Sequence, residues 1–547
     1  MKVIREVVAV LLIGVLLVTA LTLGVIGQAG VTEPKTWYVD DDLVQRPDAN
    51  FTSIQDAVDA ASPGDTIIVY PGTYTENVDV YKSLTIRSTS ENPTDTIVQA
   101  ENSSDHVIEI TAGYVSILGF TVAGATGCPN ARVYLNRADH CNISNNNVNS
   151  GCCGIWLNHS NNNTVVNNAA DYSSWCGIYL YSSNNNALIT NTASSNFGYG
   201  IFLYHSNNNT LINNTANLNY ISSGIYLCHS NGNILTNTNA SSNGYAGILL
   251  GASSYNIIAN NNANHNKWYG IDFSSSSSNT IENNNANANN EDGIHFYNSS
   301  NNIIAYNNVL DNSDDGICLV VNSSDNKIYI NNFINNTYNA GSTSSTNIWN
   351  STSKITYTYN GNTYTNYLGN YWSDYTGSDT NGDGIGDTPY SIDSDNDNYP
   401  LMEPFKIYLA TIENIFDTGV PANPYPSISG THNGTITPNK TITVSKLYTY
   451  PCEGTGGHTE YVRIWGNGID VNATWKGYAG DWHNISFNKI FTLVANETYN
   501  YTIRTGSYPQ IIHESTFNAT GGTITCEEFI GANGKVYRDW IPAIRLE

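Results

Sequence analysis

A Gly-Ile pair that recurs at nearly constant spacing is the feature that most constrains this chain of 547 residues. The glycines lie 23 residues apart, with one step of 24. They are Gly154, Gly177, Gly200, Gly224, Gly247, Gly270, Gly293 and Gly316. A period near 23 without a helical pattern is typical of a solenoid, in which each repeat forms one turn and packs on its neighbours. We therefore expect stacked turns of short strands.

Apolar residues hold constant positions inside the repeat. Counting each glycine as position 0, position 1 is always Ile and position 3 is Leu or Phe. Side chains alternate along a strand, so positions 1 and 3 face the core and position 2 faces outward. An apolar residue at position 11 and a small Ala at position 16 indicate two further strands. The repeat thus predicts three strands and three corners per turn.

Asparagine recurs at positions 9, 14 and 19, between the strand runs, with Thr238 as an exception at position 14. Asn tolerates left-handed backbone angles and bonds to nearby backbone, which suits corners. Turns stack about 4.8 Å apart, so identical amides can also bond to one another along the axis. We predict Asn ladders at the corners.

Two segments carry a resemblance to a known family. The stretch "FTSIQDAVDAASPGDTIIVYPGTYTENVDVYKSLTIRS", residues 51–88, strongly resembles the entry segment of the NosD-like branch of the pectate-lyase-like superfamily. The stretch "NYWSDYTGSDTNGDGIGDTPY", residues 370–390, resembles the segment that closes many NosD-like repeats. The resemblance implies an all-β, right-handed parallel β-helix over about residues 36–405, with a capping helix near residues 53–61. It implies no single function, because this branch includes copper-site maturation factors, sugar-active enzymes and archaeal surface proteins.

We divide the chain into four parts. Residues 1–29 form a signal peptide or an N-terminal membrane anchor, because Lys2 and Arg5 precede a long apolar run and a small-residue cleavage site. The β-helix takes residues 36–369, with its cap at 36–90 and regular turns at 154–338. Residues 370–405 form a closing segment rich in Asp and Gly. Alternating runs separated by Gly, Asn and Pro predict a β-sandwich at residues 406–547.

Charge and composition narrow the partners and the location. Only 12% of the residues are charged and the net charge is −25, which excludes nucleic acid and anionic membrane surfaces, since both need basic patches. Membrane contact is expected only through an uncleaved N-terminal segment. Many Asn-X-Ser/Thr sequons agree with an exported, glycosylated protein at the cell surface.

Aromatic residues occupy the outward position 2 in four successive turns, at Trp156, Tyr179, Phe202 and Tyr226. Stacked turns would align them as a flat exposed stripe on which sugar rings could pack. Aromatics are also good strand formers, so a stripe without any ligand is the alternative.

Acidic residues and a histidine follow in later turns. Asp272, Asp292 and His295 come close to one another across two turns and are the best candidate catalytic residues of a polysaccharide lyase or hydrolase. Arginine is absent from residue 140 to residue 462. This part of the chain therefore has no guanidinium that could pair with the carboxylate of a uronate substrate. Solvated corner charges are the alternative.

A calcium loop is predicted in the closing segment. Asp379, Asn381, Asp383 and Asp387 alternate with Gly like the first half of an EF-hand loop. Tyr390 stands where that loop needs Glu, so Asp393, Asp395 or Asp397 would complete the shell around a structural Ca²⁺.

Other metals are not expected. His159, His205 and His229 share position 5, but the column lacks the Met or further His that copper usually takes, so we read them as surface histidines. No short Cys/His spacing typical of zinc or haem occurs. In the last part, His458, Glu460, Asp481 and His483 could form a metal or sugar site, although a structural role is favoured.

Nine cysteines fit an oxidising exterior. Cys452 and Cys526 are the only cysteines of the last part, so we pair them. The connectivity stays open for the cluster of Cys128, Cys141, Cys152, Cys153 and Cys176.

The sequence favours a non-catalytic cell-surface protein over an enzyme. Its role would be recognition of a glycan or envelope polymer, or self-association into a surface array. The alternatives are a carbohydrate-active enzyme and, from the resemblance, a copper-handling maturation factor.

Overall fold

The computed structural model describes residues 33–408, 415–452, 456–475 and 483–547. The predicted signal peptide or anchor lies outside these ranges. Within them, no helix is long and apolar enough to cross a membrane. The chain divides into two compact units, one of residues up to 355 with 367–405, the other of residues 356–366 with 406–547.

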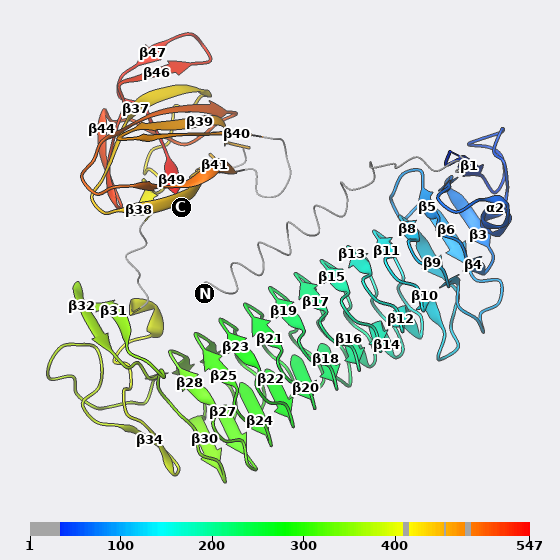
Figure 1. Cartoon of the computed structure of the whole chain (residues 1–547), viewed down its shortest axis with the longest axis horizontal. Helices are drawn as coiled ribbons and strands as arrows, with labels where there is room; N and C mark the ends of the chain where they lie inside the picture. The colour runs from blue at the N-terminus through cyan, green and yellow to red at the C-terminus, as the bar shows by residue number, and fades with distance from the viewer. Residues whose placement is uncertain (1–32, 409–414, 453–455, 476–482) are drawn as a thin grey trace. The chain divides into compact units, whose positions relative to one another are not determined.

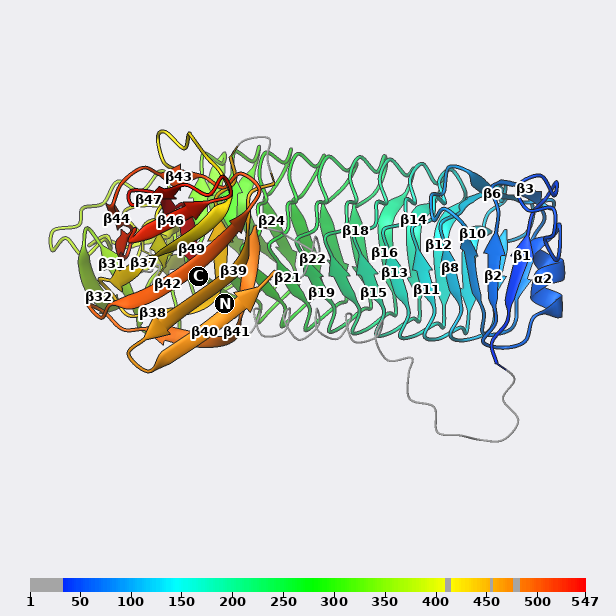
Figure 2. The same cartoon turned by 90° about the horizontal axis from the view of Figure 1, so that it is seen from above.

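The first unit is a parallel β-helix of about 12 turns, which confirms the predicted all-β solenoid (Figure 1 and Figure 2). The turns build two long sheets that run along the axis, and their third side consists of short strands and single-residue bridges. Sheet A has 13 strands. They are β1 (Thr36–Val39), β2 (Thr66–Val69), β5 (Thr85–Ser88), β8 (Ser116–Leu118), β11 (Asn142–Ser144), β13 (Thr164–Val166), β15 (Ala187–Ile189), β17 (Thr210–Ile212), β19 (Ile234–Thr236), β21 (Ile257–Ala259), β23 (Thr280–Glu282), β25 (Ile303–Ala305) and β28 (Lys327–Tyr329).

Sheet C has 12 strands and sheet B is shorter. Sheet C holds β4 (Val78–Val80), β7 (Ile108–Ile110), β10 (Ala131–Asn136), β12 (Cys153–Asn158), β14 (Cys176–Tyr181), β16 (Tyr199–Tyr204), β18 (Ile225–Cys228), β20 (Ile248–Gly251), β22 (Ile271–Ser274), β24 (Ile294–Tyr297), β27 (Asp315–Val320) and β30 (Tyr338–Thr343). Sheet B holds β3 (Gly72–Thr75), β6 (Thr96–Gln99), β9 (Thr121–Ala123), β26 (Asn308–Leu310), β29 (Asn332–Ile334) and β33 (Tyr371–Trp372). Single-residue bridges from Thr121 to Asn308 connect its two ends.

The core contains the residues that the repeat predicts. In the turn that starts at Gly200, Ile201, Leu203, Leu211 and Ala216 are all fully buried. Gly200 is needed because neighbouring turns pass very close to it. A Cβ there would lie 2.6 Å from the carbonyl oxygens of Ala193 and Gly224, closer than real Cβ contacts allow.

The predicted Asn ladders are present and buried. The backbone N–H of Asn186 donates to Oδ1 of Asn209 at 2.8 Å, and the N–H of Asn209 donates to Oδ1 of Asn233 at 2.8 Å. The side-chain amides continue the chain, with Nδ2 of Asn186 3.1 Å from Oδ1 of Asn209. Each amide therefore binds one turn to the next.

The bends differ from the prediction in place and number. The left-handed residue is the one before each ladder residue, as at Asn208 (φ 57°), Asn213 (φ 55°) and Leu218 (φ 59°). A fourth bend at position 5, such as His205 (φ 50°), precedes a buried Ser ladder that we did not predict. Its members are Ser160, Ser183, Ser206, Ser230, Ser253, Ser276, Ser299 and Ser323. The turn between sheets C and A therefore contains two bends.

The one turn of 24 residues keeps its ladders. Asn209, Asn214 and Asn219 hold their usual positions after Gly200, so the additional residue falls between Asn219 and Gly224. There Tyr220 and Ile221 are exposed.

The predicted capping helix is α2 (Ile54–Ala60), which closes the N-terminal end of the β-helix (Figure 2). Ser53 caps it, since its Oγ accepts the N–H of Asp56 at 3.3 Å. The carboxylate of Glu76 accepts the N–H groups of Ile54 and Gln55, both at 2.8 Å. These contacts satisfy N–H groups that a helix start leaves without partners.

Two buried tryptophans and two aspartates close the other end. Trp349 and Trp372 are almost fully buried. Their indole N–H groups donate to Oδ2 of Asp395 at 3.1 Å and of Asp397 at 3.0 Å. Burial raises the pKa of Asp397 to about 6. Both aspartates lie in β35 (Asp395–Asp397), which pairs with β34 (Tyr390–Ile392), and a 3-10 helix η1 (Phe405–Ile407) follows.

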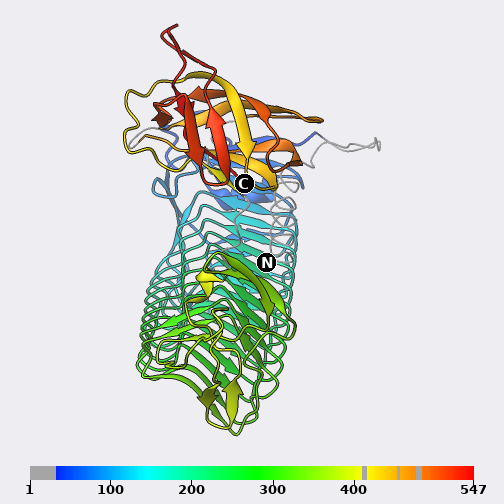
Figure 3. The same cartoon turned by 90° about the vertical axis from the view of Figure 1, so that its left-hand side faces the viewer.

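The second unit consists of antiparallel sheets around one core, which confirms the predicted β-sandwich (Figure 3). One sheet holds β36 (Phe416–Asp417), β38 (Ile442–Thr449), β41 (Asn484–Leu493) and β49 (Ile544–Leu546). The larger sheet holds β37 (Gly430–Pro438), β39 (His458–Gly466), β40 (Ile469–Thr474), β42 (Tyr499–Gly506), β44 (Thr516–Ala519), β45 (Gly522–Thr525), β46 (Glu528–Gly531) and β47 (Val536–Tyr537). Two small pairs are β43 (Ile511–Ile512) with β48 (Ile541–Pro542), and β31 (Ile355–Tyr359) with β32 (Asn362–Asn366).

The Asn ladders predict a specific loss of stability. Asn209→Ala removes the acceptor of the buried Asn186 N–H, and an unsatisfied buried group costs ~1–3 kcal/mol. We expect urea denaturation of the β-helix to show a loss of about 2 kcal/mol. Asn231→Ala is the matched control, because the bond from the Ser254 N–H to Asn231 Oδ1 is exposed and water can replace it. Equal losses in the two variants would contradict the structural role of the ladder.

Candidate functional site

The outer face of sheet C collects the residues that differ from turn to turn. Strand register places all position 2 residues in one column. In order they are Tyr134, Trp156, Tyr179, Phe202, Tyr226, Leu249, Asp272, His295 and Cys318. We call the first five the aromatic stripe. One column thus carries an aromatic end and a polar end.

Along the axis, the rings of Tyr179, Phe202 and Tyr226 stack on one another, while Trp156 is tilted against both of its neighbours in the stripe. Ring centroids lie 5.1 Å apart between Phe202 and Tyr226, with planes 3° from parallel, and 5.1 Å apart between Tyr179 and Phe202. Trp156 lies 5.6 Å from Tyr179 and 4.9 Å from Tyr134. Tyr134 extends the four predicted residues by one turn.

Neighbouring rings cover the stripe more than we predicted. Trp175 meets Tyr179 edge-on at 4.8 Å, and Tyr199 stacks on Phe202 at 4.8 Å. Tyr179 is therefore only 7% exposed, whereas Trp156, Phe202 and Tyr226 are half-buried. The flat exposed stripe of the prediction is in fact a packed ridge of rings. Burial raises the pKa of Tyr179 and of Tyr226.

At the other end of the column, the predicted candidates Asp272, Asp292 and His295 come together. His295 Nδ1 and Asp272 Oδ1 are hydrogen-bonded at 2.9 Å. The Tyr245 hydroxyl donates to the second oxygen of Asp272 at 3.0 Å, and the ring of Tyr269 stacks on His295 at 4.5 Å. The imidazole is therefore held on two sides.

Asp292 completes a group of three side chains with His295 and Cys318. One oxygen of Asp292, one ring nitrogen of His295 and Sγ of Cys318 all lie within 4.8 Å of one another. The Asp315 N–H donates to Oδ1 of Asp292 at 3.0 Å. We call Asp272, Asp292, His295, Asp315 and Cys318 the polar cluster. Cys318 was not a predicted site residue, although its place in the position 2 column, one turn after His295, was a usable signal.

The polar cluster brings several groups close together that become negatively charged when they lose a proton. Burial raises the pKa of Asp292 to about 7, with a further contribution from Asp315, whose own pKa burial raises to about 6. Burial and these carboxylates raise the pKa of Cys318. Burial lowers the pKa of His295, but the bond to Asp272 and the nearby carboxylates outweigh it and raise the pKa overall. The cluster therefore favours bound protons or a cation.

The predicted calcium residues separate into two places. Asp379, Asn381, Asp383 and Asp387 share one loop, where Asp379 accepts the N–H groups of Gly382 and Gly384 and Asp387 accepts that of Thr380. Asp393 instead accepts the N–H of Ser342 at 2.7 Å, and Asp395 binds the indole of Trp349. The last two therefore anchor the end of the β-helix.

The position 5 histidines lie at left-handed bends. The rings of His205 and His229 stack at 4.9 Å with planes 13° from parallel. His159 lies on another turn, with Nδ1 2.8 Å from Asn158 Oδ1. In the second unit, His458 contacts the Gly456 carbonyl and Glu460 binds Arg504, while Asp481 lies outside the described residues.

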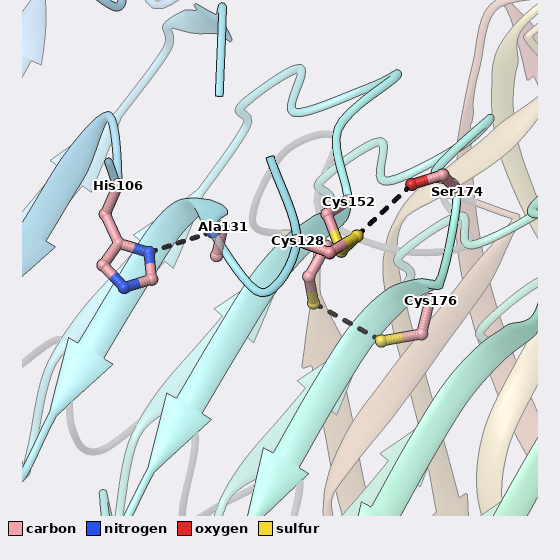
Figure 4. The surroundings of a disulfide bond; sticks show 7 residues. His106, Cys128, Ala131, Cys152, Ser174 and Cys176 are labelled. Atoms are coloured by element: carbon pink, nitrogen blue, oxygen red, sulfur yellow. Dashed lines mark hydrogen bonds between the residues drawn. A yellow bond between two sulfur atoms is a disulfide. The ribbon is translucent and has the colours of Figure 1, made fainter. Parts of the chain in front are cut away.

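One disulfide is present, between Cys128 and Cys152 (Figure 4). Next to it, the thiols of Cys153 and Cys176 lie 3.4 Å apart in the register of β12 and β14. The predicted Cys452–Cys526 disulfide is not formed in this structure. Cys452 Sγ lies 3.6 Å from the Pro509 carbonyl oxygen, whereas the buried Cys526 follows β45 and its N–H bonds to Ser515.

Comparisons with known proteins identify relatives of the β-helix. The family model described as "Periplasmic copper-binding protein (NosD)" matches residues 58–238 and 217–377. A cell surface glycoprotein of Methanothermus fervidus is 36% identical over 108 residues, which are 19% of this chain and 17% of that protein.

Solved structures are similar to this chain at low identity. The A-module of mannuronan C-5 epimerase AlgE6 from Azotobacter vinelandii is 15% identical, with a TM-score of 0.47, and the match covers 54% of this chain and 91% of that one. The Dettilon tailspike protein is 11% identical, with a TM-score of 0.43, over 82% of this chain and 88% of that one.

Copper, which the family description names, fits this chain only in part. Copper sites favour imidazole and sulfur ligands. His205 and His229 stack face to face, so their ring nitrogens lie in nearly parallel planes and do not converge on one point. Among the described residues, two groups of three ligand side chains converge, and one of them, Asp40 with Asp41 and Asp42, offers oxygen alone. The other is Asp292 with His295 and Cys318, where carboxylate accompanies nitrogen and sulfur.

Proposed function

The chain belongs to the NosD family, and we propose that it is an exported cell-surface protein whose β-helix binds a glycan or envelope polymer along the aromatic stripe without cleaving it. The observation that carries the proposal is a continuous row of five aromatic side chains in register on one face of sheet C, of which Tyr179, Phe202 and Tyr226 stack on one another. The similarity to a cell surface glycoprotein supports the location.

The packed state of the stripe favours binding. Aromatic rings present rigid apolar faces, and a sugar ring can lie on them while its hydroxyls stay in water. Because the rings already hold one another by stacking, little side-chain freedom is lost when a ligand binds. Trp156, Phe202 and Tyr226 keep part of their surface exposed, so a ligand can reach them.

The negative charge of the protein favours some classes of glycan over others. The chain carries a net charge of −25, and Asp272 of the polar cluster continues the same column beyond the stripe. Arginine is absent from residue 140 to residue 462, so no guanidinium there can neutralise an acidic sugar. A neutral, hydroxyl-rich polymer therefore suits this face better than a polyuronate.

Glycan binding predicts which residues matter. On a glycan array, Trp156→Ala and Tyr226→Ala should each weaken binding about 10-fold, which corresponds to ~1.4 kcal/mol of lost contact. Tyr255→Ala is the control, because Tyr255 is 71% exposed and lies outside the stripe. If no glycan binds on the array and the protein assembles into ordered sheets, glycan recognition is contradicted and self-association into a surface array becomes the function to test.

A carbohydrate-active enzyme is the second candidate. The observation in its favour is the His295–Asp272 hydrogen bond with Asp292 close by, since cleavage of a glycosidic bond needs positioned acid and base groups. If the protein cleaves a polymer that it binds, Asp272→Asn should lower the rate at least about 100-fold. Asp325→Asn, at an exposed corner, should leave the rate unchanged. Absence of cleavage products from every bound glycan would remove this candidate.

A structural calcium ion in the loop of Asp379, Asn381, Asp383 and Asp387 is also proposed. In this loop the carboxylates already accept backbone N–H groups, so an ion would bind through their remaining lone pairs. We expect Ca²⁺ to raise the melting temperature of the chain, and Asp379→Ala to abolish that shift. Asp311→Ala is the control at an exposed position outside the loop. An unchanged melting temperature at millimolar Ca²⁺ would contradict the proposal.

A further inference from the structure

We propose that the polar cluster is a mononuclear zinc site, in which Asp292, His295 and Cys318 supply three ligands and the fourth position is open to solvent. Nothing in the family description or the relatives assigns a role to these residues. The inference does not depend on glycan binding.

The geometry suits one small ion. Zinc takes carboxylate oxygen and imidazole nitrogen at about 2.0–2.2 Å and thiolate at about 2.3 Å, usually in a tetrahedron. Ligand atoms of such a site lie about 3.5 Å apart. In the structure the three candidate atoms already lie within 4.8 Å of one another. Binding of an ion would draw these three atoms closer together.

The surroundings of His295 are those of a metal ligand. A ligating histidine typically donates its other ring N–H to a carboxylate, which sets the tautomer and the ring orientation. Asp272 provides this carboxylate at 2.9 Å, and Tyr245 in turn holds Asp272 at 3.0 Å. Tyr269 stacks on the ring and restricts its rotation. Because Nδ1 is bonded to Asp272, Nε2 is the ring nitrogen that would bind the ion.

Burial and charge agree with a cation that faces solvent on one side. Asp292 is 5% exposed, whereas His295 and Cys318 are half-buried. A buried carboxylate needs a compensating charge or a proton. Asp272 and Asp315 add two more carboxylates next to these ligands. A divalent ion would offset the negative charge of these carboxylates. Three protein ligands would leave one coordination position free, as in catalytic zinc sites.

The donor set favours zinc over other metals. Calcium and magnesium take oxygen ligands, which the thiol and the imidazole do not supply. Copper(I) prefers thiolates and thioethers, and the carboxylate is a poor ligand for it. Zinc accepts all three donor types.

The repeat explains why the spacing of Cys and His in the sequence indicated no zinc site. Zinc motifs are sought as Cys and His a few residues apart. Here His295 and Cys318 are separated by 23 residues, which is one turn of the β-helix, and strand pairing makes them direct neighbours.

The test is metal binding to the full chain. After treatment with a chelator, isothermal titration should show one Zn²⁺ bound per chain, and Cys318→Ser or His295→Ala should remove the binding. Asp272→Ala should weaken it about 10–100-fold, the usual effect of removing a partner of a ligating histidine. Cys228→Ser is the matched control, since Cys228 is a half-buried cysteine of the same sheet in another turn.

Cobalt substitution gives a second measurement that needs no variant. Tetrahedral Co²⁺ in place of zinc should show a thiolate charge-transfer band. Absence of stoichiometric Zn²⁺, a spectrum without the thiolate band, or full binding by Cys318→Ser would each overturn the site. Binding of copper(I) under anaerobic conditions without binding of Zn²⁺ would overturn the assignment to zinc.

Discussion

Hydrogen bonds that run along the axis, from one turn to the next, are the interaction on which this molecule depends. Strand pairing supplies part of them, and the buried Asn and Ser ladders supply the rest at the bends, where strands end. A bend buried without such partners would leave backbone N–H groups unsatisfied, at a cost of ~1–3 kcal/mol each. The abundance of asparagine therefore reflects the need to bond every corner to its neighbour.

Because the ladders and the core hold the register, residues one turn apart become neighbours on the surface. Nothing in the core restricts position 2, whose side chains point away from it. The same column can thus carry a ridge of stacked rings in some turns and a set of carboxylate, imidazole and thiol groups in others. Glycan contact and metal binding would then be two uses of one scaffold, separated by a few turns along its axis.

The period alone predicted much of this structure. The buried Ile and Leu positions, the Asn ladders and the neighbours of Asp272 and His295 all follow from counting in steps of 23, whereas the capping helix followed from the family resemblance. What did not follow depends on backbone angles or on side-chain direction. The Ser ladder was missed although Ser recurs at position 6 of seven successive turns, because the left-handed residue before it varies among His, Ser, Ala and Asn and so did not indicate a corner. Tyr199 and Trp175 cover the stripe from positions whose direction the period does not reveal. Asp393 and Asp395 bind to a turn far away in sequence, which no local pattern shows.

The single turn of 24 residues has a consequence for how such a protein can change. Its additional residue lies in the connection between Asn219 and Gly224, where Tyr220 and Ile221 reach solvent while the ladders on both sides stay intact. That connection leads from sheet B into sheet C, directly beside the stripe. Additional residues can therefore be placed in this connection, where they would lie next to a bound polymer. Ligand specificity could therefore change through this connection while the strands and ladders of every turn stay the same.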